Sequence, residues 1–209
     1  MRANILTTLA LTLPLALAGC TTPTIVNNDE PRPEPAAQPT TTAAPARNST
    51  NLVNAFDYGV PVDGVTRYFF TTPSGRWQCA IVPRVRAGCQ AAGGADLDFP
   101  GTPESVPGPD GEPTAPNVIE ISRDGDTAFA AVEGTPFEPE PGPANVLQFN
   151  QILAAAGFRC NVQEASGISC LSERSGKGFA FSTEAFTPQY LEVPAGAPTA
   201  TPTTTRTTG

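Results

Sequence analysis

Histidine is absent from the whole chain, and Lys177 is the only lysine among its 209 residues. The absence of histidine excludes Ser-His-Asp and Cys-His catalysis, histidine-containing zinc sites and proton transfer through imidazole. Basic side chains are also scarce, because 12 Lys and Arg face 20 Asp and Glu, which gives a net charge of -8. This acidic balance argues against nucleic acid as the main partner.

Proline is abundant, with 24 residues, or about twice the usual one in twenty. The residues from 21 to 50 hold seven threonines and six prolines with almost no large apolar side chains. Such a segment cannot bury enough surface to order itself, so we expect residues 20–51 to form a tether. Residues 194–209 are similarly rich in threonine and predict a disordered tail.

The first residues have the order of a secretory signal, with Arg2, an apolar run from 5 to 17, and small residues before Cys20. The run is shorter than the roughly 20 residues that span a bilayer. Leu17-Ala18-Gly19-Cys20 resembles the lipobox of bacterial lipoproteins, in which diacylglycerol is attached to the cysteine thiol. We therefore expect a lipoprotein signal peptide at 1–19, lipidation at Cys20, and anchoring in the lipid bilayer at the outer face of the cytoplasmic membrane. The alternative is an ordinary signal peptide with a coincidental cysteine.

Between the tails, residues 52–193 predict one globular, mainly β domain, a small antiparallel sheet or barrel-like structure. Asp124-Gly125 is a strong hairpin signal, because both residues tolerate a positive φ. The proline-rich acidic insertion at 99–117 predicts an exposed loop. Short runs rich in β-formers predict strands at 65–71, 77–82, 85–91, 118–122, 127–132 and 178–182, the last half-buried. The segment 146–156 fits a helix as well as a strand.

Four cysteines remain in the domain, and they form two units with nine residues between the cysteines of each. The equal spacing suggests two copies of one unit, although three disulfide connectivities are possible. If each unit is a hairpin, its cysteines lie opposite one another, which favours Cys79 with Cys89 and Cys160 with Cys170. The alternative is a metal site of four thiolates, which the long spacing and an oxidising compartment disfavour.

A longer pattern surrounds these cysteines: 70–79 reads Phe-Thr-Thr-Pro-Ser-Gly-Arg-Trp-Gln-Cys, and Arg86-Ala87-Gly88-Cys89, 157–160, 166–170 and 175–179 follow. The pattern resembles an uncharacterised family of small secreted proteins and lipoproteins of actinobacteria, whose usual opening is Phe-x-Ser-Pro-Ser-Gly-Asn-Ile-x-Cys. The chain departs from that opening at Thr72, Arg76 and Trp77. The resemblance implies a mainly β fold, paired disulfides and a strand at 146–153, and it transfers no catalytic residue.

Basic residues gather around the two disulfide units in the sequence, and the aromatic residues Trp77 and Phe158 lie next to them. If both hairpins lie in one sheet, these side chains converge on one rim that suits an anionic partner in the cell envelope. The alternative is a set of solvated strand faces and turns. The predicted binding residues are Arg76, Trp77, Arg84, Arg86, Phe158, Arg159, Arg174 and Lys177.

The sequence thus predicts a lipid-anchored, non-enzymatic binding module of the bacterial cell envelope, with no cofactor and no catalytic residue. The alternative function is an envelope hydrolase that uses a pair of carboxylates or a dyad of Ser175 and Lys177. Nothing in the spacing marks two of the 20 acids as partners.

Overall fold

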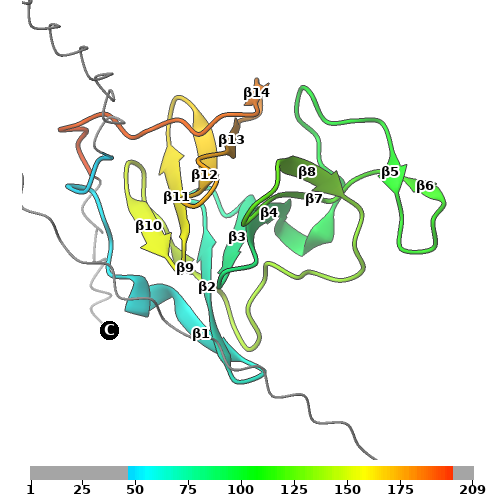
Figure 1. Ribbon diagram of the computed structural model, residues 1–209, viewed down its shortest axis with the longest axis horizontal. Helices are drawn as coiled ribbons and strands as arrows, with labels where there is room; N and C mark the ends of the chain where they lie inside the picture. Colours follow the sequence, from blue (N-terminus) through cyan, green and yellow to red (C-terminus); the bar gives the residue numbers. More distant parts are fainter. Residues whose placement is uncertain (1–46, 200–209) are drawn as a thin grey trace, which may run out of the picture. The chain divides into compact units, whose positions relative to one another are not determined.

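The computed structural model describes residues 47–199, so the predicted signal peptide, Cys20, most of the tether and the end of the tail lie outside the described residues. The larger sheet has the order β1-β2-β3-β4-β7-β8, with antiparallel neighbours, and β9 runs parallel to β2. The smaller sheet is antiparallel, in the order β10 to β14 (Figure 1). The predicted mainly β, antiparallel fold is therefore confirmed.

The elements have the following bounds. The larger sheet consists of β1 (Gly59–Val62), β2 (Val65–Thr71), β3 (Trp77–Val82), β4 (Arg86–Ala91), β7 (Val118–Ser122), β8 (Thr127–Ala130) and β9 (Asn145–Val146). The smaller sheet consists of β10 (Ile152–Ala155), β11 (Phe158–Gln163), β12 (Gly167–Ser172), β13 (Gly178–Phe181) and β14 (Phe186–Thr187). A third pair is β5 (Val106–Pro107) and β6 (Pro113–Thr114), and two 3-10 turns are η1 (Ala55–Tyr58) and η2 (Ala92–Gly94).

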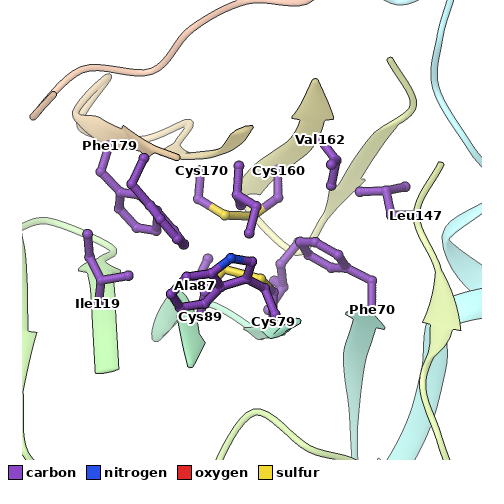
Figure 2. Packing of buried hydrophobic residues seen from close by; sticks show 14 of the residues in the cluster. Phe70, Cys79, Ala87, Cys89, Ile119, Leu147, Cys160, Val162, Cys170 and Phe179 are labelled. Carbon is purple, nitrogen blue, oxygen red and sulfur yellow. A yellow bond between two sulfur atoms is a disulfide. The ribbon is translucent and has the colours of Figure 1, made fainter. Parts of the chain in front are cut away.

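The core lies between the two sheets and contains both disulfides. Cys79 pairs with Cys89 across β3 and β4, and Cys160 pairs with Cys170 across β11 and β12, each with Cα atoms 4.1 Å apart. This spacing is near the roughly 4.5 Å of directly opposed residues in an antiparallel pair. Figure 2 shows the two bridges facing each other across the space between the sheets. The predicted pairing within each unit is confirmed.

The two disulfide hairpins lie in different sheets and run in opposite directions. The turn between β3 and β4 contacts the turn that leads into β11, because the Arg84 amide donates to the carbonyl of Ala156 at 3.2 Å. The turn between β11 and β12 is therefore at the other end of the molecule. Since alternate residues of a strand point to opposite faces, the inward cysteines place Arg86 and Arg159 on the two outer faces.

The outer face of the larger sheet is covered by the segment that follows β8. Phe137 is fully buried there, with Phe69, Ala80 and Val118. Gly88 of β4 permits the close approach, since a Cβ at this position would lie 2.6 Å from the ring of Phe137 and 2.7 Å from the Ile119 carbonyl. The larger sheet is therefore buried on both faces around β4.

The proline-rich insertion is mainly exposed and carries the small β5–β6 hairpin. Its predicted limits differ from those of the structure, because Phe99 is buried and stacks on Phe181 with ring centroids 4.6 Å apart. At the other limit Asn117 exchanges two hydrogen bonds with the backbone of Val132, each 2.9 Å long. The residues at both limits are thus part of the packed domain.

Two segments differ in detail from the sequence predictions. The segment 146–156 is neither a helix nor one strand: β9 ends at Val146, a turn with Asn150 at φ 63° follows, and β10 begins at Ile152. Ile152 and Leu153 are adjacent and both fully buried, so the alternating pattern does not apply, and their extended backbone in β10 excludes the helix. Strand β13 is buried at all four residues rather than half-buried, because Phe179 and Phe181 pack into the core on one face and Tyr190 covers Gly178 on the other, where a Cβ would lie 3.1 Å from it.

The two ends of the described chain are hydrogen-bonded to each other. The side-chain amide of Asn48 donates to the carbonyl of Val193 at 3.1 Å, and that of Asn51 donates to the carbonyl of Ala197 at 3.0 Å. Val193 is fully buried. This terminal clasp extends the packed domain beyond residues 52 and 193, into segments predicted as tether and tail.

Candidate anion-binding hollow at the turn end

Four hairpin turns meet at one end of the two packed sheets. The amide of Arg123, in the β7–β8 turn, donates to the Val85 carbonyl at 2.9 Å, and its own carbonyl accepts from the Ser172 hydroxyl at 2.6 Å. The amide of Glu173, in the β12–β13 turn, donates to the Gly157 carbonyl at 3.0 Å. These bonds join turns from both sheets, so the backbone under this end is held in place.

Three arginines line a hollow of about 420 Å³ between these turns: Arg84, Arg123 and Arg174, with Ala156 and Gly157. We call it the arginine hollow. Arg174 pairs with Asp124, whereas Arg84 and Arg123 form no ion pair with any residue in 47–199. Lys177 is close by, since its ammonium pairs at 2.6 Å with Asp126, which lies in the β7–β8 turn together with Arg123 and Asp124. The hollow therefore carries a net positive charge on an acidic protein.

Of the predicted binding residues, the structure brings Arg84 and Arg174 together, with Lys177 beside them. Arg123 was not among the predicted residues. Its place in the lining depends on β7 pairing with β4, which puts the β7–β8 turn beside the β3–β4 turn. The only signal for Arg123 in the sequence was its position next to the predicted Asp124-Gly125 hairpin turn.

The other five predicted residues lie elsewhere, so the eight do not form one rim. Arg86, on the outer face of the larger sheet, pairs with Glu120 at 2.9 Å and lies over the ring of Phe137 at 5.5 Å. Arg159, on the opposite outer face, is 8% exposed and donates to the Asn48 carbonyl at 2.9 Å. The predicted convergence required both hairpins in one sheet, and the topology contradicts that condition.

The aromatic members are core residues. Phe158 is fully buried, and Trp77 is 6% exposed with its ring edge-on to Phe181. Arg76 and Trp77 lie at the end of β3 remote from Arg84, because Trp77 pairs with Ala91 at the far end of the hairpin. The arginine hollow thus has no aromatic side chain in its lining.

The acidic insertion does not neutralise the hollow. It precedes Val118, which pairs with Gln90 at the remote end of β4, whereas the hollow lies beside Ser122 at the other end of β7. A separate concavity of about 290 Å³ contains Asp110 of the insertion, together with Asp96 and Glu133. The described part of the chain contains no group of three acidic or cysteine side chains arranged for a metal ion.

The side chains considered for a hydrolase, Ser175 with Lys177 and the carboxylates, are not arranged for catalysis. Ser175 accepts a hydrogen bond from the backbone amide of Lys177 at 3.2 Å, while the ammonium of Lys177 is engaged with Asp126. Within residues 47–199 no Asp or Glu is buried. Two tyrosines outside the hollow have shifted pKa values: burial raises the pKa of Tyr190 to about 12, and burial, with the Asp57 carboxylate second, raises the pKa of Tyr58.

The chain matches no protein-family model, no curated protein and no solved structure. The resemblance to the actinobacterial family therefore stays a prediction. Within the described residues, no helix has the length and apolar character needed to cross a membrane.

Proposed function

We propose that the protein is an exported bacterial lipoprotein whose β domain binds an anionic component of the cell envelope without chemical conversion. The observation that carries this proposal is the arginine hollow, in which Arg84 and Arg123 have no carboxylate partner among the described residues. Arginine binds carboxylate and phosphate through two parallel hydrogen bonds. A hollow held by four turns offers several such donors to one anionic group.

The proposed anchor rests on the sequence from Leu17 to Cys20 and on the mature domain's two disulfides, which suit an oxidising compartment outside the cytoplasm. Acylation of Cys20 would attach the protein to the outer face of the cytoplasmic membrane. Anionic groups of cell-wall polymers and lipid headgroups would then be the most abundant partners within reach.

A binding function has more support than hydrolysis. The ammonium of Lys177 is engaged with Asp126, so it is not positioned to activate Ser175, and no Asp or Glu side chain within 47–199 is buried as a catalytic acid commonly is. The hollow also has no nucleophilic side chain in its lining. An assay for release of soluble wall fragments tests the hydrolase directly.

The proposal is tested by retention of the full-length protein on purified cell-wall material that carries anionic polymers. The variant Arg84→Gln with Arg123→Gln removes both unpaired charges, and neither side chain donates a hydrogen bond within 47–199. We expect binding to weaken about tenfold or more, since two charge-assisted contacts are lost and 1.4 kcal/mol corresponds to tenfold.

The control variant is Arg47→Gln with Arg67→Gln, which changes the net charge equally at exposed or half-exposed sites outside the hollow. It should be retained like the wild type, and wall material stripped of its anionic polymers should retain none of the proteins. Equal loss in both double variants would show a general charge effect and contradict the proposed site.

A further inference from the structure

Another concavity opens between the two sheets at the end opposite the arginine hollow. It has a volume of about 270 Å³ and lies between the β2–β3 turn (72–76) and the β11–β12 turn (164–166). Apolar side chains from both sheets line it: Trp77, Phe149, Val162, Ile168 and Phe181. We call it the Trp77 cleft. Figure 2 shows Val162, one of the lining residues, directed into the space between the sheets.

The aromatic lining is rigid. The rings of Trp77 and Phe181 meet edge to face with centroids 4.8 Å apart, and Phe99 stacks on the other side of Phe181 at 4.6 Å. Because these three side chains are at most 6% exposed, their rotamers are fixed by the core, and the cleft exposes only a small part of them beside the half-buried Phe149. An apolar ligand would therefore meet a surface that is already formed, which lowers the entropic cost of binding.

A cation stands at the mouth of the cleft. The Arg76 guanidinium carbon is 5.7 Å from the centre of the Trp77 ring, in a cation–π contact. Arg76 is exposed and forms no ion pair with a described residue.

The turn that carries Arg76 is held in place. The Ser74 hydroxyl accepts from the Arg76 amide at 3.3 Å and hydrogen-bonds the Thr72 hydroxyl at 3.1 Å. The backbone at Arg76 is thus held in place, and its guanidinium lies over the Trp77 ring with unused donors.

We propose that the Trp77 cleft binds a small apolar monocarboxylate, with its ring or hydrocarbon body on the aromatic floor and its carboxylate on Arg76. The volume is below the roughly 300 Å³ at which pockets for drug-sized ligands begin, so the ligand has about a dozen heavy atoms. Glu164 lines the opposite side of the mouth and repels a second negative charge. This site is separate from the arginine hollow and does not depend on the lipid anchor.

The test uses Trp77, the only tryptophan in the chain, as a fluorescent reporter. The full-length protein is titrated with 3-phenylpropanoate, with its uncharged amide and with the dicarboxylate phenylsuccinate, and the same titrations are followed by calorimetry. We expect saturable binding of 3-phenylpropanoate with a Kd on the order of 0.1 to 1 mM. The amide and the dicarboxylate should each bind at least about tenfold more weakly.

Arg76→Gln should weaken 3-phenylpropanoate binding about tenfold without affecting the amide, because the Arg76 side chain makes no hydrogen bond within the described chain. Arg67→Gln on β2 removes an equal charge outside the cleft and should bind like the wild type. The proposal is overturned if neither method detects saturable binding, if the amide binds as well as the acid, or if both variants lose affinity equally. Retention on cell-wall material is measured independently, so failure here leaves the arginine hollow untouched.

Discussion

Removal of either disulfide should cost a large and nearly equal part of the domain's stability. Each bridge has a sequence separation of 10, and its two cysteines are fully buried. In the chain-entropy relation, a cross-link that closes a loop of about 10 residues lowers the conformational entropy of the unfolded chain by about 9 cal/mol/K. This entropy loss stabilises the folded state by about 2.7 kcal/mol at 25 °C. The variants are Cys79→Ala with Cys89→Ala, and Cys160→Ala with Cys170→Ala.

Lost packing adds to this entropic effect. Each alanine pair deletes two sulfur atoms from the core between the sheets, at about 1 kcal/mol per buried group of that size. We therefore expect each pair to lower the free energy of unfolding by about 4 to 5 kcal/mol. Serine pairs should cost more, because each buried hydroxyl without a partner adds about 1 to 3 kcal/mol. Since all four cysteines belong to one core cluster, removal of both bridges should be non-additive.

The assay is urea unfolding followed by Trp77 fluorescence and by circular dichroism, with non-reducing peptide mapping to verify the remaining bridge. A loss below about 1 kcal/mol for either alanine pair would refute the entropic reasoning. A difference above about 2 kcal/mol between the pairs would refute the equivalence of the two hairpins. Under native conditions, reduction by a thiol should be limited by unfolding, because the four cysteines have no exposed surface.

Three further predictions address other parts of the chain. Cys20→Ala should move the protein from the membrane fraction to the soluble fraction, and unchanged membrane association would rule out the acyl anchor. Replacement of 103–114 by a short Gly/Ser linker should leave Tm within about 5 °C of the wild type. In contrast, Phe99→Ala in the core should lower the free energy of unfolding by about 3 to 5 kcal/mol. A larger loss of Tm for the linker variant than for Phe99→Ala would contradict the assignment of 103–114 as an exposed loop. Because the pKa of Tyr190 is about 12 in the folded state against 10.0 unfolded, the unfolded chain loses this proton first, and stability should fall between pH 10 and 12 by about 1 to 3 kcal/mol. Tyr190→Phe should flatten that pH dependence in urea titrations, and a slope identical to the wild type would refute it.

Local pairing was predictable from the sequence because it depends on neighbours along the chain. The equal spacing of the cysteines placed Cys79 opposite Cys89 about a turn at Arg84, and Arg84 indeed has a φ of 59°. Asp124-Gly125 marked the β7–β8 hairpin, which is present, although neither residue has the positive φ that the prediction assumed.

The assembly of the hairpins was not predictable, because it depends on contacts between distant segments. No pattern of neighbouring residues predicts that β4 pairs with β7 across the insertion, or that the two disulfide hairpins belong to different sheets. The site follows that assembly. Arg84 and Arg86 are two residues apart, yet one lines the hollow and the other pairs with Glu120 on an outer face.

The terminal clasp determines how mechanical load would pass through the domain. Asn48 and Val193 are joined directly, so a pull applied at residue 47 and resisted at residue 199 meets the hydrogen bonds of the clasp first. These bonds break one after another, as in unzipping, because the two segments leave the domain at neighbouring points. The disulfide core lies outside this force path. A domain held at both ends would therefore lengthen by releasing a few terminal residues, while its two sheets, the arginine hollow and the Trp77 cleft stay intact.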